Sequence, residues 1–149
     1  AMTMGAIVAE TSEENANLIY DFGLNLGIAF QLQDDFLDAF GNPETFGKQV
    51  GGDIIENKKT YLYLKAMEFA NEEDKQQLLH LFSIQPSDNS NKIESVKTIF
   101  NTSGASEATK NAIKDFTFKA FETLEKIDIK NEKRAILKAF GENLMGRNV

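Results

Sequence analysis

The chain of 149 residues contains no cysteine, a single histidine, and only 16 basic residues against 23 acidic ones. The lack of cysteine excludes disulfide bonds, thiolate catalysis and zinc–thiolate sites, and it suits a cytoplasmic protein. The net charge of −7 and the lack of a basic stripe argue against nucleic acid or an anionic membrane surface as the principal partner. No apolar run approaches the ~20 residues of a membrane span, so we expect none.

The single histidine, His80, lies between leucines, and no matching acid or nucleophile is apparent. We therefore expect a helix residue at the margin of a core and not a catalytic base. The acidic run 72–74 follows Asn71 and is typical of the first turn of a helix. A polar loop is expected at 83–91, without a domain linker or an internal repeat. The periodic stretches predict a single all-α domain over 1–149, a bundle of about six helices without strands.

Three aspartates, Asp34, Asp35 and Asp38, fall within about one helical turn of an otherwise apolar helix pattern. Carboxylates this close repel one another, and burial of an unpaired charge is costly enough that proteins neutralise it or bind a metal there. A solvent-exposed face is the simpler alternative, because most charged residues on helices face water. The surrounding residues decide between these two interpretations.

Counting back from Asp38 in steps of three and four leads to one helix face that carries almost no bulk: Asp34, Gln31, Gly27, Gly23 and Tyr20. A glycine inside a helix costs about 1 kcal/mol relative to alanine, so two of them on one face indicate a packing or ligand role. Close approach of another helix and a groove for an elongated ligand both remain open. The other faces carry bulky apolar residues such as Phe22, Leu26 and Phe36, which predicts a central helix.

Glycines and a proline after Phe40 predict the end of this helix and a loop that contains Lys48. Asp53 and Glu56 have capping-box spacing, which predicts a new helix from about Ile54 with Lys58 and Lys59 in its second turn. Carboxylates that hold Mg²⁺, ammonium groups and exposed backbone amides together are typical of a polyphosphate site. For Lys48 alone, a solvated loop lysine is an equally simple interpretation.

These residues together resemble the C-terminal half of the trans-type isoprenyl diphosphate synthases, the family that makes farnesyl, geranylgeranyl and longer prenyl diphosphates. The likeness is strong between about residues 5 and 64 and diffuse beyond, where the last helices look like packing elements. It is carried by the ordered segments Phe30-Gln31-x-x-Asp34-Asp35-x-x-Asp38, Gly41-x-Pro43-x-x-x-Gly47-Lys48 and Gly51-Gly52-Asp53-x-x-x-Asn57-Lys58-Lys59-Thr60.

The resemblance implies an all-α isoprenoid synthase fold and a Mg²⁺-dependent prenyltransferase with catalytic roles for Asp34, Asp35, Lys48 and Lys58. In the family, the metal-bound aspartates would be Asp34, Asp35 and Asp38. Substrate contacts would come from Gln31, Lys48, Lys58, Phe30 and Gly27. Ionisation of an allylic diphosphate gives a carbocation, the double bond of isopentenyl diphosphate attacks it, and the released diphosphate takes the lost proton.

The chain departs from the family in lacking a second Asp-Asp-x-x-Asp motif, and its two arginines, Arg134 and Arg147, both lie near the C-terminus. The likeness therefore implies a fragment that begins about halfway through a synthase and that transfers prenyl groups poorly or not at all alone. Apolar surface left by missing helices predicts a homo-oligomer, and we expect a dimer. A non-catalytic helical subunit of an intact synthase is an alternative. A terpene cyclase fits less well, because the Gly-Lys and Asn-Lys-Lys-Thr segments resemble synthases.

Overall fold

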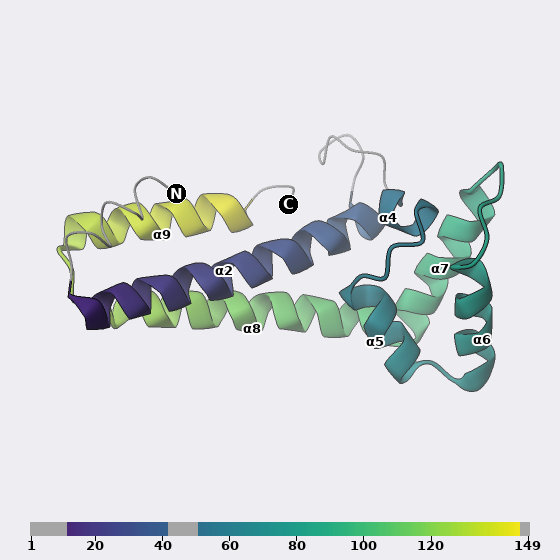
Figure 1. Ribbon diagram of the computed structural model, residues 1–149, viewed down its shortest axis with the longest axis horizontal. Coiled ribbons are helices and arrows are strands. Elements are labelled where there is room, and N and C mark those ends of the chain that lie inside the picture. Colours follow the sequence, from purple (N-terminus) through teal and green to yellow (C-terminus); the bar gives the residue numbers. More distant parts are fainter. Residues whose placement is uncertain (1–11, 42–50, 147–149) are drawn as a thin grey trace. The chain divides into compact units, whose positions relative to one another are not determined.

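The computed structural model describes residues 12–41 and 51–146. Every regular element in these ranges is an α-helix, which confirms the all-α prediction, although seven helices stand where about six were expected (Figure 1). No helix among them is both long enough and apolar enough to cross a membrane. The helices are α2 (Glu13–Phe40), α4 (Gly52–Ile55), α5 (Tyr61–Phe69), α6 (Glu72–Leu81), α7 (Ser90–Thr102), α8 (Ala105–Glu125) and α9 (Asn131–Met145).

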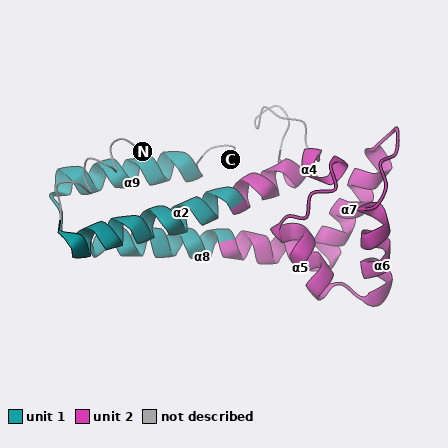
Figure 2. Cartoon of the chain, in the orientation of Figure 1, with its two compact units in different colours: residues 1–31, 113–147 teal, residues 32–112, 148–149 magenta. Residues whose placement is uncertain are grey.

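The chain divides into two compact units, shown in different colours in Figure 2. Within the described residues, the first unit holds 12–31 and 113–146, and the second holds 32–41 and 51–112. Both long helices, α2 and α8, contribute residues to each unit. The single domain expected from the sequence stays a prediction.

The first unit is a three-helix arrangement around one apolar cluster. Its fully buried side chains come from the start of α2, the end of α8, the loop after α8, and α9, and they are Ile19, Phe22, Leu26, Ala120, Leu124, Ile127 and Leu137. Phe22 and Phe121 meet edge to face, with ring centroids 6.0 Å apart. The start of α2 is tied to the α8–α9 loop because the Asn15 amide donates to the Asp128 carbonyl and accepts from its N–H. These contacts explain why the apolar faces of helices distant in sequence form one core.

The second unit packs the end of α2 and the start of α8 with α4, α5, α6 and α7. Its buried cluster is Ala39, Ile54, Leu62, Tyr63, Ala66, Leu78, Leu81, Phe82, Val96, Ile99, Phe100 and Ala105. Asn71 caps α6, since its side-chain oxygen accepts the Asp74 N–H at 2.8 Å, as the acidic run after it predicted. His80 lies in the last turn of α6 and is exposed.

Candidate functional site

The three aspartates of the predicted metal motif lie in the last two turns of α2. Asp34 is partly exposed, whereas Asp35 and Asp38 each keep only 9% of their surface accessible. The burial follows from the neighbouring aromatic residues, because Phe36 and Phe40 pack against the core of the second unit and draw this segment into it. A fully solvated acidic face therefore does not describe these residues. Two of the three carboxylates lie where a charge needs a partner.

Asp38 joins the end of α2 to the start of α4. Its carboxylate Oδ2 accepts the N–H of Asp53 at 2.8 Å, and its backbone carbonyl accepts the N–H of Gly51. Gly51 stands at the N-cap of α4 and makes no side-chain capping bond, so Asp38 supplies the missing acceptor from another helix. One carboxylate oxygen of the predicted metal ligand thus has a structural partner.

The path of the chain before Asp53 depends on glycine at position 51. Gly51 has a φ of +92°, a left-handed conformation that side chains rarely adopt, and an added Cβ would lie 2.9 Å from the Ile93 side chain. A Cβ on Gly52 would meet the Asp38 Oδ1 atom at 3.4 Å. The Gly-Gly-Asp segment therefore brings the backbone of α4 close to the carboxylate of Asp38.

The helix after these glycines differs from the prediction. It begins at Gly52 and not near Ile54, and it ends at Ile55, so Lys58 and Lys59 follow the helix and do not form its second turn. The capping-box interpretation of Asp53 is wrong, because Gly51 is the N-cap residue. The N–H groups of Asn57 and Lys58 donate to the carbonyls of Ile54 and Asp53, the paired bonds of a Schellman motif.

Lys58 and Lys59 point to different partners after this turn. The Lys58 ammonium lies 3.8 Å from the Asp53 Oδ1 atom, with 54% of the lysine side chain and 22% of the aspartate side chain exposed. The Lys59 ammonium lies 5.8 Å from the centre of the Tyr63 ring. Asp38, Asp53 and Lys58 therefore form a connected series of contacts, from the aspartate-rich helix end to an accessible cation.

Sequence reasoning did not assign Asp53 to the site, although it is the residue that links Asp38 to Lys58. Lys48 lies outside the described residues. Within 12–41 and 51–146, no three acidic or histidine side chains form a group that could hold a metal ion. In the structure, Asp53 contacts both Asp38 and Lys58. Asp34 and Asp35 lie on α2, the same helix as Asp38.

The face of α2 predicted to lack bulk is open over much of its length within the first unit. Gly27, Gln31 and Tyr20 are exposed, and Phe30 is half-buried. A Cβ on Gly27 would meet nothing within 4 Å, so no helix among the described residues approaches closely there. The described residues therefore give no close helix packing at Gly27, and the ligand-groove interpretation stays a prediction.

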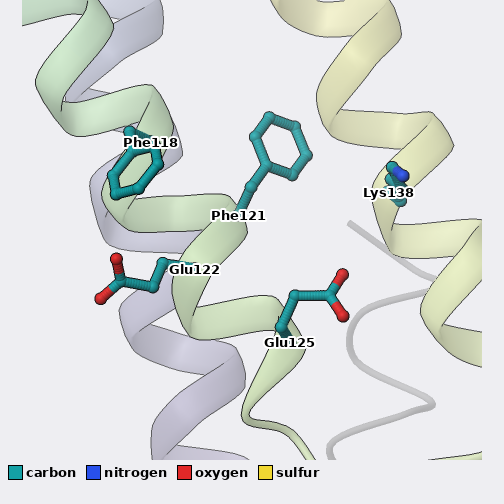
Figure 3. Close-up of a pocket in the computed structure, with 5 residues that line it drawn as sticks. All are labelled: Phe118, Phe121, Glu122, Glu125 and Lys138. Atoms are coloured by element: carbon teal, nitrogen blue, oxygen red, sulfur yellow. The ribbon is translucent and has the colours of Figure 1, made fainter.

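An open groove of about 320 Å³ lies between α8 and α9 in the first unit (Figure 3). Its lining combines apolar rings with charged groups and consists of Phe118, Phe121, Glu122, Glu125 and Lys138. The groove contains none of the residues that the sequence assigned to the metal or diphosphate site.

Residues 1–101, which include the whole aspartate-rich segment and the lysine turn, match the family described as polyprenyl synthetase. The chain belongs to the polyprenyl synthetase family. A short chain isoprenyl diphosphate synthase of Methanothermobacter thermautotrophicus is 34% identical over 136 residues, which are 91% of this chain and 41% of that protein. A geranylgeranyl diphosphate synthase of Sulfolobus acidocaldarius is 42% identical over 77 residues, 52% of this chain and 23% of that protein.

Solved structures of polyprenyl synthetases have the same fold. A crystal structure of a geranylgeranyl pyrophosphate synthase superposes with a TM-score of 0.85 at 48% identity, covering 99% of this chain and 46% of the other. A geranylgeranyl pyrophosphate synthase from Corynebacterium glutamicum, complexed with isoprenyl diphosphate and magnesium, gives 0.80 at 30% identity, covering 93% and 39%. The chain thus spans less than half the length of these relatives.

Proposed function

We propose that this polyprenyl synthetase chain provides the second metal and diphosphate site for prenyl transfer in isoprenoid biosynthesis. The substrates would be an allylic prenyl diphosphate and isopentenyl diphosphate. In the reaction, the allylic C–O bond to diphosphate breaks, a C–C bond to isopentenyl diphosphate forms, and a proton passes to the released diphosphate. The continuous series of contacts from Asp38 through Asp53 to Lys58 supports this proposal, since it joins the acidic segment to an accessible cation.

The residues fit Mg²⁺ by their chemistry. Carboxylate oxygens are hard donors, and Mg²⁺ is usually held by one or two carboxylates together with waters and substrate phosphates. A preformed group of three carboxylates is therefore not required, and the phosphate oxygens would complete the site. Asp34, Asp35 and Asp38 would hold the ion, which when bound neutralises charge on the leaving diphosphate.

Lys58 and Lys48 would bind the same diphosphate as point charges, and Gln31 would orient it by hydrogen bonding. Lys58 suits this role because more than half of its side chain is accessible while its backbone N–H is fixed on the Asp53 carbonyl. Phe30 and Gly27 precede the aspartates on α2, and the prenyl tail would follow them along the helix. These assignments extend the family likeness to individual residues of this chain.

The proposal is tested by calorimetric titration of farnesyl diphosphate into the purified chain, with and without Mg²⁺, beside an assay of prenyl transfer to isopentenyl diphosphate. Mg²⁺-dependent binding is the expected result, whether or not turnover accompanies it. Binding without turnover would describe a chain that carries one half of a catalytic site. No binding in either condition would contradict the proposal and favour the non-catalytic helical subunit.

Gly27 gives a prediction about the prenyl tail. Gly27→Leu should weaken Mg²⁺-dependent binding of farnesyl diphosphate by about tenfold or more, because the side chain would occupy the open face of α2. Inorganic diphosphate has no tail, so its binding should stay unchanged. Helix stability should not fall, since leucine is a better helix former than glycine by roughly 0.8 kcal/mol and meets no neighbour. Equal losses of affinity for both ligands would contradict the placement of the prenyl tail along this face of α2.

We also propose that the chain forms a homo-oligomer. Large apolar side chains are exposed in both units, including Tyr20, Leu64 and Phe118, which are 67%, 57% and 68% accessible. Exposed apolar surface of this kind favours self-association. Repulsion between chains of net charge −7 opposes association only in part. Sedimentation velocity at several concentrations should show species larger than the 16.6 kDa monomer. A monomer at all concentrations would contradict the prediction.

A further inference from the structure

Lys92 is a buried lysine for which the site described above gives no role. It lies on the apolar face of α7, one turn before Val96, and only 2% of its surface is accessible. Its ammonium donates to the Ile84 carbonyl at 2.8 Å and to the Asn57 side-chain oxygen. Both acceptors are neutral amide oxygens, and burial lowers the pKa of Lys92.

Asn57 is held by this lysine from its side chain and by α4 from its backbone. Its φ of +59° is left-handed, and its N–H donates to the Ile54 carbonyl. Its side-chain nitrogen also donates to the Ile84 carbonyl, at 3.3 Å. Asn57, Ile84 and Lys92 therefore form a closed triangle of hydrogen bonds that ties the turn after α4 to α7 and to the loop before α7.

The turn fixed in this way is the one that presents Lys58. We infer that Lys92 is a positioning residue: through Asn57 it fixes the backbone of the turn that places Lys58 beside Asp53, and so sets the cation of the diphosphate site. The effect on ligand binding rests on the proposed function. The effect on the turn rests on the hydrogen bonds alone and can be measured without any ligand.

The ammonium of Lys92 carries a desolvation cost, which its two neutral acceptors offset only in part. Methionine has nearly the length of lysine and packs well among Val96 and its neighbours. What methionine cannot do is donate to Asn57. The distinctive contribution of Lys92 is thus the link to the turn.

The test uses the whole chain and the variants Lys92→Met, Asn57→Gly and the double variant. Glycine at position 57 keeps the left-handed backbone and removes the two side-chain hydrogen bonds, to Lys92 and to the Ile84 carbonyl. Amide hydrogen exchange at residues 57 and 58 should be at least about tenfold faster in each single variant, the factor expected for a lost charge-assisted hydrogen bond. The double variant should change exchange by less than the product of the two single factors, because both single variants remove the hydrogen bond between Lys92 and Asn57. Melting temperatures are measured beside the exchange rates, because a general loss of stability would accelerate exchange throughout the chain and not only at residues 57 and 58.

Binding is then measured by titration of farnesyl diphosphate with Mg²⁺. Lys92→Met should weaken it about five- to tenfold, whereas Lys114→Met, the same charge change at an exposed residue of α8, should leave both exchange and binding unchanged. Unchanged exchange at residues 57 and 58 in Lys92→Met would overturn the inference, as would faster exchange with unchanged binding. Should the unsubstituted chain bind no ligand, the proposed function fails, and the exchange rates alone decide whether Lys92 fixes the turn.

Discussion

Asp34→Asn should abolish Mg²⁺-dependent binding of farnesyl diphosphate, with Kd raised at least about 100-fold. Substitution of groups that only support a metal ligand costs 10- to 100-fold in metal affinity, so loss of a ligand should cost at least as much. Asparagine keeps the shape of the side chain and removes its charge. Calorimetric titration of farnesyl diphosphate in the presence and absence of Mg²⁺ measures the change, and circular dichroism should show nearly unchanged helicity.

Asp34 is a sharper test than Asp38, because Asp38 also caps α4 through the Asp53 N–H. Asp38→Ala removes a ligand and a cap together, and the lost cap alone costs about 1 kcal/mol. Asp38→Asn keeps an oxygen acceptor for the Asp53 N–H and separates the two effects. We expect Asp38→Asn to weaken binding strongly while the melting temperature falls less than in Asp38→Ala.

The matched control for Asp34→Asn is Asp115→Asn, which makes the same charge change at an exposed residue of α8. Binding should be unchanged in this control, since Asp115 is exposed to solvent and its charge is screened by salt. Wild-type affinity in Asp34→Asn would contradict the metal-site assignment of the aspartate-rich segment. Equal losses in both variants would indicate a general effect of net charge.

The sequence predicted the fold well because its apolar periodicity is strong and its helix signals are local. Phe22 and Leu26, chosen from spacing alone, are almost fully buried, and Asn71 caps α6 as its acidic neighbours indicated. Such features depend on residues within one or two turns of each other. The predicted start of α4 was wrong because the residue that caps this helix, Asp38, lies on another helix. The local sequence at Asp53 resembled a capping box and suggested a later start.

The site was predicted less completely, for a related reason. Asp34, Asp35, Asp38 and Lys58 stand in recognisable segments, whereas the links between them depend on tertiary contacts. Lys92 is separated by 35 residues from the Asn57 side chain it binds. The available signal was a lysine on the apolar stripe of α7, one turn before Val96, which indicates a buried and therefore partnered charge. The identity of that partner could not follow from spacing.

Phe22→Ala and Phe100→Ala should each destabilise the whole chain by about 3–5 kcal/mol, a large part of the 5–15 kcal/mol of a typical domain. Both rings are almost fully buried, Phe22 in the core of the first unit and Phe100 in that of the second. A chain of this length should lose roughly 6 to 20 °C in melting temperature. Phe118→Ala makes the same chemical change at a ring that is 68% exposed and should cost less than about 0.5 kcal/mol.

The pair of core variants also tests whether 1–149 is one domain. We propose that it is, because α2 and α8 each contribute to both cores, so neither unit can unfold without breaking two helices of the other. Scanning calorimetry should then show one transition, with equal calorimetric and van't Hoff enthalpies, that moves to lower temperature in both variants. Hydrogen exchange in both units should accelerate together. Two transitions, each moved by only one of the variants, would show that the units fold independently despite the helices they share.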